Sequence, residues 1–267
     1  MTMKPVTLLT LATLLATFSA TPQATAAVPS GEDALKSQFD VPKTNIKTNI
    51  PNALRILFIG DSITLHGTNA TIAQKLGWDH EAGMAASVPG NDYVHLFAGQ
   101  LQALHPDRKV EVYFHTLGGS GSVQQRLAAI DQVKGVEPHL IVVQLGEHEK
   151  QADGLEKLQV NYAQLLTAFN DQQPAAPQVI AIGPWAPILT NKNSRYNGWS
   201  GEVENSMRTI CETQKIPYIS VRDLADDTTC FGWGTSGGVQ WHPNDKGHAG
   251  YATKLLAAYK QLSLANR

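Results

Sequence analysis

The sequence predicts an α/β domain whose mostly parallel sheet is covered by helices on both faces. Two observations lead to this fold class. Short apolar runs rich in β-branched residues alternate along the chain with amphipathic stretches of helical period, and neither a repeat nor a linker divides the chain after residue 53. Parallel strands need crossover connections, so strands that alternate with helices indicate a parallel sheet with right-handed crossovers.

Five apolar runs have the length and residue types of buried strands. They cover residues 55–59, 110–114, 140–144, 179–182 and 218–221. Four other stretches place their apolar residues on one face of a helix. They cover residues 93–104, 155–169, 203–211 and 247–264. We therefore expect a single domain over residues 54–267, closed by the last of these helices.

One stretch, residues 65–89, does not fit a plain strand-to-helix connection. It contains several glycines together with Trp78 and Met84. It directly follows the first strand, at the edge where open α/β sheets bind ligands. We expect this insertion to form a wall of a pocket.

Composition excludes several classes of protein. The 267 residues are 42% hydrophobic and 16% charged, with 21 Lys+Arg against 23 Asp+Glu and a net charge of -2. Such a chain is not disordered, collagen-like or dense in disulfides. A near-neutral balance without basic runs also argues against a nucleic-acid partner.

The first 26 residues have the pattern of a secretory signal peptide. Lys4 precedes an apolar run over residues 5–18, and Ala24-Thr25-Ala26 fits the small-residue cleavage site. We expect cleavage after Ala26 or Ala27, an N-terminal tether over residues 27–53, and a secreted or periplasmic protein. The alternative is an uncleaved anchor. The run is short for a membrane span and no later segment approaches that length, so we expect no stable span after cleavage.

Export would permit a disulfide between the two cysteines, Cys211 and Cys230. Two separate buried thiols are the alternative, because free cysteine is often buried. The sequence leaves both open. Nine histidines suggest a metal, but no pair has the H-E-x-x-H spacing of a helical zinc site. We expect neither a metal nor another cofactor.

Chemistry is expected where the first strand ends, at Gly60-Asp61-Ser62-Ile63-Thr64. The glycine lets the backbone turn sharply, so Ser62 should lie at the carboxyl edge of the sheet. A serine there can act as a nucleophile if a base lies within hydrogen-bond distance. The alternative is that Ser62 caps the helix that follows.

A candidate base lies before the last helix, in Trp241-His242-Pro243-Asn244. Pro243 restricts the backbone after His242, which suggests a histidine held on a rigid loop. Imidazole can accept a proton at neutral pH. His248 begins the helix, and we interpret it as structural.

These two segments resemble the SGNH (GDSL) hydrolase superfamily of esterases, lipases and carbohydrate deacetylases. Two further blocks support the resemblance, residues 118–127 after the second strand and Gly146-Glu147-His148-Glu149 after the third. The resemblance implies a flavodoxin-like α/β/α fold of three layers around a five-stranded, mostly parallel sheet. It also implies that Ser62 is the nucleophile, that His242 is the base, and that the N–H groups of Ser62 and Gly121 form an oxyanion hole with the side chain of His148.

His148 departs from the family, which has an asparagine amide at that position. An imidazole N–H can still donate a hydrogen bond to an oxyanion. The alternative is that His148 only packs against a loop or bonds to it.

A second departure is Val239, which stands where the family has its acid, three residues before His242. Three groups could orient the imidazole instead: a backbone carbonyl within residues 235–240, the side chain of Gln240, or a carboxylate from elsewhere, such as Asp223, Asp226 or Asp227. We favour the carbonyl, and with it a Ser62–His242 dyad, because the glycine-rich loop 232–238 allows close approach.

The function expected from these residues is an exported serine esterase. Its substrate would be a small-molecule or carbohydrate ester, with a short acyl or acetyl group, cleaved through a Ser62 acyl-enzyme. An O-acyltransferase acting on envelope polysaccharide would use the same residues. A ligand-binding relative that has lost catalysis is a third hypothesis, motivated by Val239 and His148. Trp185, Arg195, Tyr196 and Trp199 could line the substrate site or simply pack in a loop.

Overall fold

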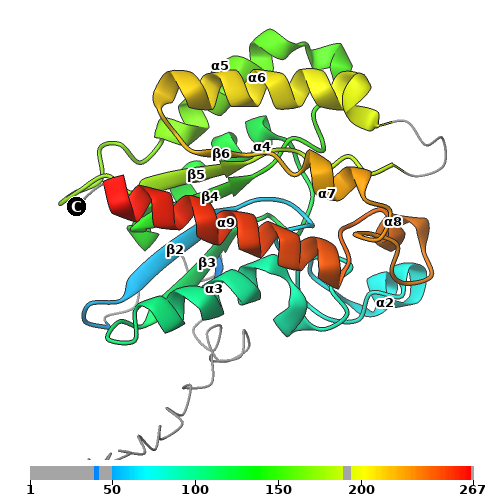
Figure 1. Cartoon of the computed structure of the whole chain (residues 1–267), viewed down its shortest axis with the longest axis horizontal. Coiled ribbons are helices and arrows are strands. Elements are labelled where there is room, and N and C mark those ends of the chain that lie inside the picture. The colour runs from blue at the N-terminus through cyan, green and yellow to red at the C-terminus, as the bar shows by residue number, and fades with distance from the viewer. Residues whose placement is uncertain (1–38, 42–49, 189–193, 266–267) are drawn as a thin grey trace, which may run out of the picture.

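The computed structural model describes residues 39–41, 50–188 and 194–265. The described chain forms a parallel six-stranded sheet in the order β1-β3-β2-β4-β5-β6 (Figure 1). The strands are β1 (Phe39–Val41), β2 (Leu54–Ile59), β3 (Val110–His115), β4 (Leu140–Gln144), β5 (Gln178–Ile182) and β6 (Tyr218–Ile219). The predicted α/β fold with a parallel sheet is confirmed.

The sheet has one strand more than the five we expected. Strand β1 lies within the residues interpreted as a tether, and it pairs in parallel with β3, Phe39 opposite Tyr113. Three residues are too few to show a periodic pattern, so pairing with β3 rather than local sequence defines this strand. Strand β6 is shorter than predicted and ends at Ile219. The expected signal peptide and its cleavage site lie outside the described residues.

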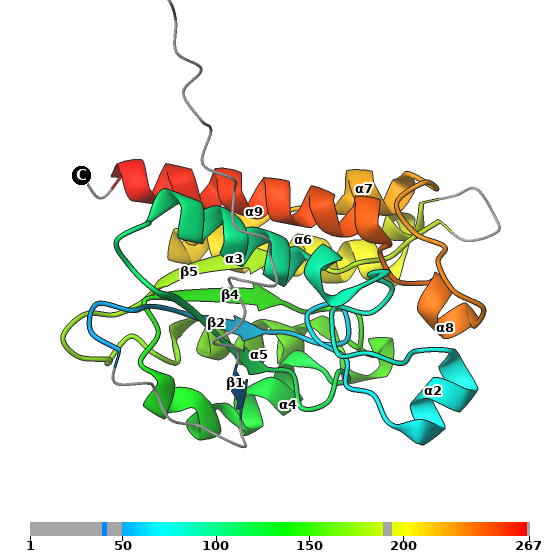
Figure 2. The ribbon, with the colours of Figure 1, turned by 90° about the horizontal axis from the view of Figure 1, so that it is seen from below.

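Helices cover both faces of the sheet, as Figures 1 and 2 show. On one face α3 (Tyr93–Leu104) and α9 (Asp245–Ala265) pack against each other and the strands. The other face carries α4 (Val123–Ala128), α5 (Leu155–Thr167) and α6 (Trp199–Gln214). Successive side chains of a strand point to opposite faces, and this explains why residues 56–59 of β2 are all apolar. Phe58 lies in the core under α3 and α9, whereas Leu57 lies in the core under α4 and α5.

The predicted insertion packs against the loop that carries His242. It contains the short helix α2 (Ala70–Leu76), and Figure 1 shows α2 beside α8 (Gly237–Gln240) at one end of the molecule. Trp78 is fully buried in a small apolar cluster that includes Met84 from the insertion and Val239 from α8. The insertion therefore supports the loop that carries His242.

The remaining short helices also lie in connections. They are α7 (Arg222–Asp226) and the 3-10 helices η2 (Pro89–Asn91), η3 (Ile130–Val136), η4 (Gln151–Asp153) and η5 (Arg195–Asn197). No helix in the described part of the chain is long and apolar enough to cross a membrane.

The two cysteines are buried free thiols. Cys211 on α6 lies in the core on one face of the sheet, and Cys230 lies in the core on the other. The disulfide that export would permit is therefore not formed.

Candidate active site

The turn after β2 brings Ser62 to the carboxyl edge of the sheet. Gly60 is required there, because a Cβ atom at this position would lie 2.0 Å from Thr64 Oγ1. The N–H groups of Thr64 and Leu65 both donate to the carbonyl of Asp61 and close the turn. Ser62 is 7% exposed, so its hydroxyl lies in a largely dehydrated site.

Ser62 and His242, far apart in sequence, are joined by a hydrogen bond. Ser62 Oγ lies 2.7 Å from His242 Nε2, and His242 Nδ1 lies 2.7 Å from the carbonyl oxygen of Gly238. A carbonyl can only accept, so Nδ1 carries the proton and Nε2 presents its lone pair to the serine hydroxyl. This is the tautomer that a general base needs.

Burial keeps His242 neutral. Desolvation lowers the pKa of His242 to about 3; the bond to Gly238 raises the pKa, and the nearby His248, His66 and His148 lower it. A neutral imidazole can accept the serine proton at any pH near 7.

The position of the missing acid is occupied by a backbone carbonyl. Val239 is fully buried in the cluster around Trp78, and the amide of Gln240 donates to the carbonyl of Gly234. The three candidate aspartates pair elsewhere: Asp223 with Lys254 at 3.0 Å, Asp226 with Arg222 at 3.9 Å, and Asp227 with Lys246 at 2.8 Å. The Gly238 carbonyl is thus the group that orients the imidazole.

The glycine-rich loop after β3 is linked to the start of the Ser62 turn through Arg126, which donates to the carbonyls of Gly60 and Ser120. Gly118, Gly119 and Gly121 have φ values of 85°, 103° and 129°, which strongly favour glycine. Helix α4 follows the loop, and the Val123 N–H at its start donates to Glu149 Oε1 over 2.8 Å. Because Glu149 is the neighbour of His148, this bond links the segment 118–127 to the segment 146–149.

His148 lies at the same edge, with its side chain 43% exposed. Its Nε2 atom is 3.7 Å from Asp61 Oδ2, and Asp61 precedes Ser62 in the turn. The His148 ring therefore lies beside the turn that carries Ser62, with one side open to solvent. The structure brings together the ends of β2, β3 and β4, where Ser62, Gly121 and His148 were each predicted.

A buried carboxyl pair under the site was not predicted. Glu147 Oε1 accepts bonds of 2.6 Å from Gln144 Nε2 and from the Trp185 N–H. The other carboxyl, Asp61, is also buried. Burial raises the pKa of both, and the charge of Asp61 raises that of Glu147 further. The only sequence signal was the presence of Glu147 within the segment 146–149 that resembles the family.

The aromatic residues after β5 have packing roles. Trp185 is buried and its indole N–H donates to the carbonyl of Trp241, Tyr196 is buried and donates to the carbonyl of Pro184, and Trp199 donates to the carbonyl of Glu149. These bonds support loops that carry the site.

His248 has the structural role that we expected. It is fully buried, accepts from the Tyr93 N–H through Nδ1, and donates to the carbonyl of Met84 through Nε2. It thereby fastens the insertion to α9.

Solved structures with similar folds include two hydrolases. LAE5, an α/β hydrolase enzyme from the metagenome of Lake Arreo, Spain, is 18% identical with a TM-score of 0.51, over 80% of this chain and 96% of that chain. Axe2, an acetylxylan esterase from Geobacillus stearothermophilus, is 17% identical with a TM-score of 0.54, over 79% of this chain and 96% of that chain. At these identities the likeness shows the fold.

Family membership rests on a separate match. No curated protein matches the sequence, whereas the model of the GDSL-like Lipase/Acylhydrolase family matches residues 58–249. The matched range runs from the end of β2 into α9 and includes every residue placed in the site above. The chain therefore belongs to the GDSL-like lipase/acylhydrolase family, of the SGNH type, and is a carboxylic ester hydrolase.

Proposed function

We propose that this protein is an exported serine esterase that removes short acyl groups, acetyl above all, from carbohydrate esters through an acyl-enzyme on Ser62. The observation that carries the proposal is the continuous chain of hydrogen bonds from Ser62 Oγ through His242 to the carbonyl of Gly238, at 2.7 Å in each step. It supplies a nucleophile, a neutral base and the group that orients that base.

In the first half-reaction Ser62 Oγ attacks the ester carbonyl carbon as its proton moves to His242 Nε2. The Oγ–C bond forms, and the carbonyl electron pair moves to oxygen. The N–H groups of Ser62 and Gly121, with the His148 ring, would stabilise this oxyanion. Collapse breaks the bond to the alcohol oxygen, which takes the proton from Nε2 and leaves.

In the second half-reaction water repeats the attack on the acyl-enzyme. His242 takes a proton from the water and returns it to Ser62 Oγ as the acid leaves. Throughout, the Nδ1–H bond to Gly238 holds the ring in one orientation. A carbonyl is neutral, so it stabilises the transient imidazolium less than a carboxylate would.

Support for the substrate class comes from the relatives and from the expected export. Axe2 is named as an acetylxylan esterase, and the signal-like N-terminus would carry the enzyme to extracellular polysaccharide. An acyltransferase would form the same acyl-enzyme and differ only in the acceptor of the second step.

The test is an ester panel with the chain from residue 27 onward. We expect hydrolysis of p-nitrophenyl acetate and acetylated xylan, a decline with acyl length, and an acetyl group on Ser62 in a trapped intermediate. Ser62→Ala should lower kcat by about 10³-fold or more. Ser220→Ala is the control and should not lower kcat, because the Ser220 hydroxyl donates a hydrogen bond to the Glu204 carboxylate. Full activity in Ser62→Ala would refute the nucleophile, and preferential transfer of acetyl to an added sugar would assign the acyltransferase reaction instead.

A further inference from the structure

Arg126, on α4, is a fully buried cation beneath the glycine-rich loop. Its guanidinium donates to three main-chain carbonyls: Nε to Gly60 over 2.7 Å, and Nη2 to Thr116 and Ser120 over 2.5 Å each. Gly60 begins the nucleophile turn, and the other two belong to the loop after β3. One side chain therefore links the two segments that would carry the N–H donors of the oxyanion hole.

The bond to Ser120 bears directly on Gly121. The Ser120 carbonyl and the Gly121 N–H belong to one peptide unit, and in a trans peptide these two groups point in opposite directions. The described chain has its one cis peptide at Gln173-Pro174, so this unit is trans. With its carbonyl held by Arg126, its N–H must point away from the guanidinium.

The contact between Arg126 and Gly121 is close as well as directional. A Cβ atom added at Gly121 would lie 2.8 Å from Arg126 Nη1, so the guanidinium packs directly against the glycine. Desolvation lowers the pKa of Arg126 to about 10, and the charge of Asp61 opposes that shift. The group thus remains a cation at neutral pH. Its charge on the carbonyl polarises the peptide and makes the N–H at the other end a stronger donor.

We infer that Arg126 is a positioning residue for ester hydrolysis, which aims and polarises the Gly121 N–H toward the oxyanion. The inference rests on the proposed function, because it assigns a role within that oxyanion hole. Lysine cannot replace the arginine, since a single ammonium lacks the planar fork that reaches all three carbonyls.

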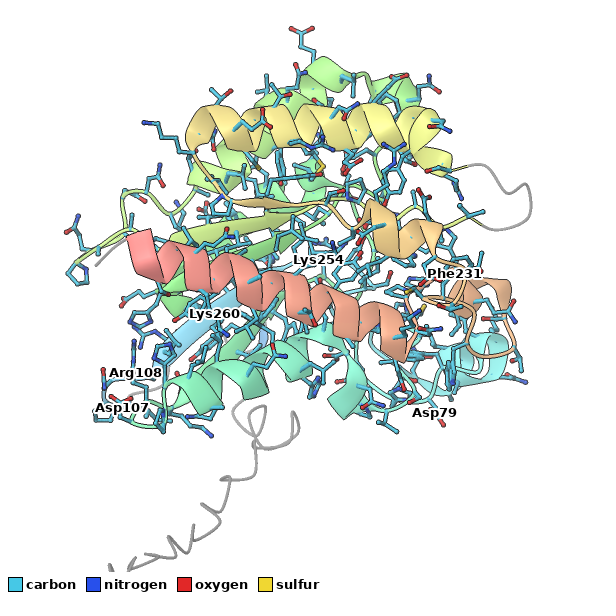
Figure 3. The ribbon with its side chains drawn as sticks, viewed as in Figure 1. Asp79, Asp107, Arg108, Phe231, Lys254 and Lys260 are labelled. Atoms are coloured by element: carbon cyan, nitrogen blue, oxygen red, sulfur yellow. The ribbon has the colours of Figure 1, made fainter. Side chains whose placement is uncertain are left out.

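The test compares Arg126→Lys and Arg126→Ala with a matched control, Arg108→Met. Arg108 donates through Nε to the carbonyl of Asn52 and through Nη2 to that of Ala53. Figure 3 labels it at the end of the molecule away from Phe231, which pairs with Pro243 beside the catalytic histidine. Each variant is assayed with p-nitrophenyl acetate for kcat and KM, and its fold is followed by thermal unfolding.

A misaligned donor should lower kcat with little change in KM, because the oxyanion exists only in the transition state. We expect Arg126→Ala to lose about 10²-fold in kcat, the cost of one lost oxyanion donor. Arg126→Lys should lose at least about tenfold by the same reasoning, and Arg108→Met should keep the wild-type kcat. Added guanidinium ion, far below denaturing concentrations, should restore part of the kcat of Arg126→Ala.

A folded Arg126→Lys variant with wild-type kcat would overturn the inference, as would a loss confined to thermal stability. Rescue of kcat by guanidinium would support the inference, because a residue that only stabilises the fold would affect thermal stability and not kcat alone. Failure of the proposed function itself would appear separately, as wild-type protein without esterase activity or as an active Ser62→Ala variant.

Discussion

Removal of the three aspartates that could have replaced the missing acid tests whether His242 acts as a base without a carboxylate partner. We expect Asp223→Ala, Asp226→Ala and Asp227→Ala each to keep kcat within about tenfold of wild type, a change of about 1.4 kcal/mol in the activation free energy. The reason is geometric. Each carboxylate pairs with a lysine or arginine, and His242 Nδ1 is bonded to the Gly238 carbonyl instead.

The size of the loss in kcat distinguishes an imidazole held by a carboxylate from one held by a backbone carbonyl. Where a buried carboxylate holds the imidazole, its loss costs about 10⁴ in kcat, or about 5.4 kcal/mol. A bond to a neutral carbonyl contributes about 1 kcal/mol in net terms. A dyad therefore has no side chain whose deletion would cost thousands-fold, apart from Ser62 and His242 themselves.

A second experiment perturbs the Gly238 carbonyl by destabilising helix α8, which contains it. Ser236 caps α8, and its side chain accepts from the Val239 N–H over 3.2 Å. Ser236→Ala removes a cap that contributes about 1 kcal/mol, so kcat should fall several-fold as the Gly238 carbonyl loosens. Ser194→Ala, at the cap of η5, is the matched control and should not change kcat.

The assay is steady-state hydrolysis of p-nitrophenyl acetate, with circular dichroism to verify the fold. A thousandfold loss of kcat in any one folded aspartate variant would refute the dyad and identify the missing acid. An unchanged kcat in Ser236→Ala would show that α8 does not control the imidazole.

Three further predictions concern protonation and packing. Because the pKa of His242 is lowered to about 3, kcat/KM should stay level as the pH falls through 6.5, and an acid limb centred at 6.5 would contradict this. Glu147→Gln should raise Tm more at pH 8 than at pH 4, because a carboxyl whose pKa is raised by folding loses its contribution to stability as the pH rises. Equal Tm changes at both pH values would contradict the raised pKa of Glu147. Val239→Asp should cost about 3 kcal/mol in urea unfolding, because it buries a carboxylate among apolar side chains, whereas a stable variant with higher kcat would mean that the new carboxylate reaches His242.

Local sequence was sufficient for the order of the elements and for the residues at the edge of the sheet. The apolar run of β4 is buried along its whole length, and burial on both faces is what makes a central parallel strand continuously apolar. Parallel strands all end at one edge, so a chemically active residue after each strand must approach the others. This is why Ser62 and His148 could be placed at one site, and why the family match over residues 58–249 agrees with the resemblance that the motifs carry.

Strand β1 shows what the sequence alone could not determine. It has three residues and exists because β3 offers a free edge, and pairing with a distant strand leaves little trace in so short a segment. The cysteines are a similar case, since only the path of the chain decides that Cys211 and Cys230 lie under opposite faces of the sheet.

The hydrogen-bond partner of His242 Nδ1 was decided by the tertiary structure for a more general reason. Every residue carries a carbonyl, so the sequence could favour a carbonyl within residues 235–240 over Gln240 or a distant aspartate, but it could not select Gly238. The raised pKa of Glu147 and the hydrogen bond from Arg126 to the Ser120 carbonyl likewise depend on loops that meet in space. Residue identity therefore determined which groups could do the chemistry, and the packing of the loops decided how they are oriented and charged, because hydrogen bonds and desolvation act over a few ångströms in space and not along the chain.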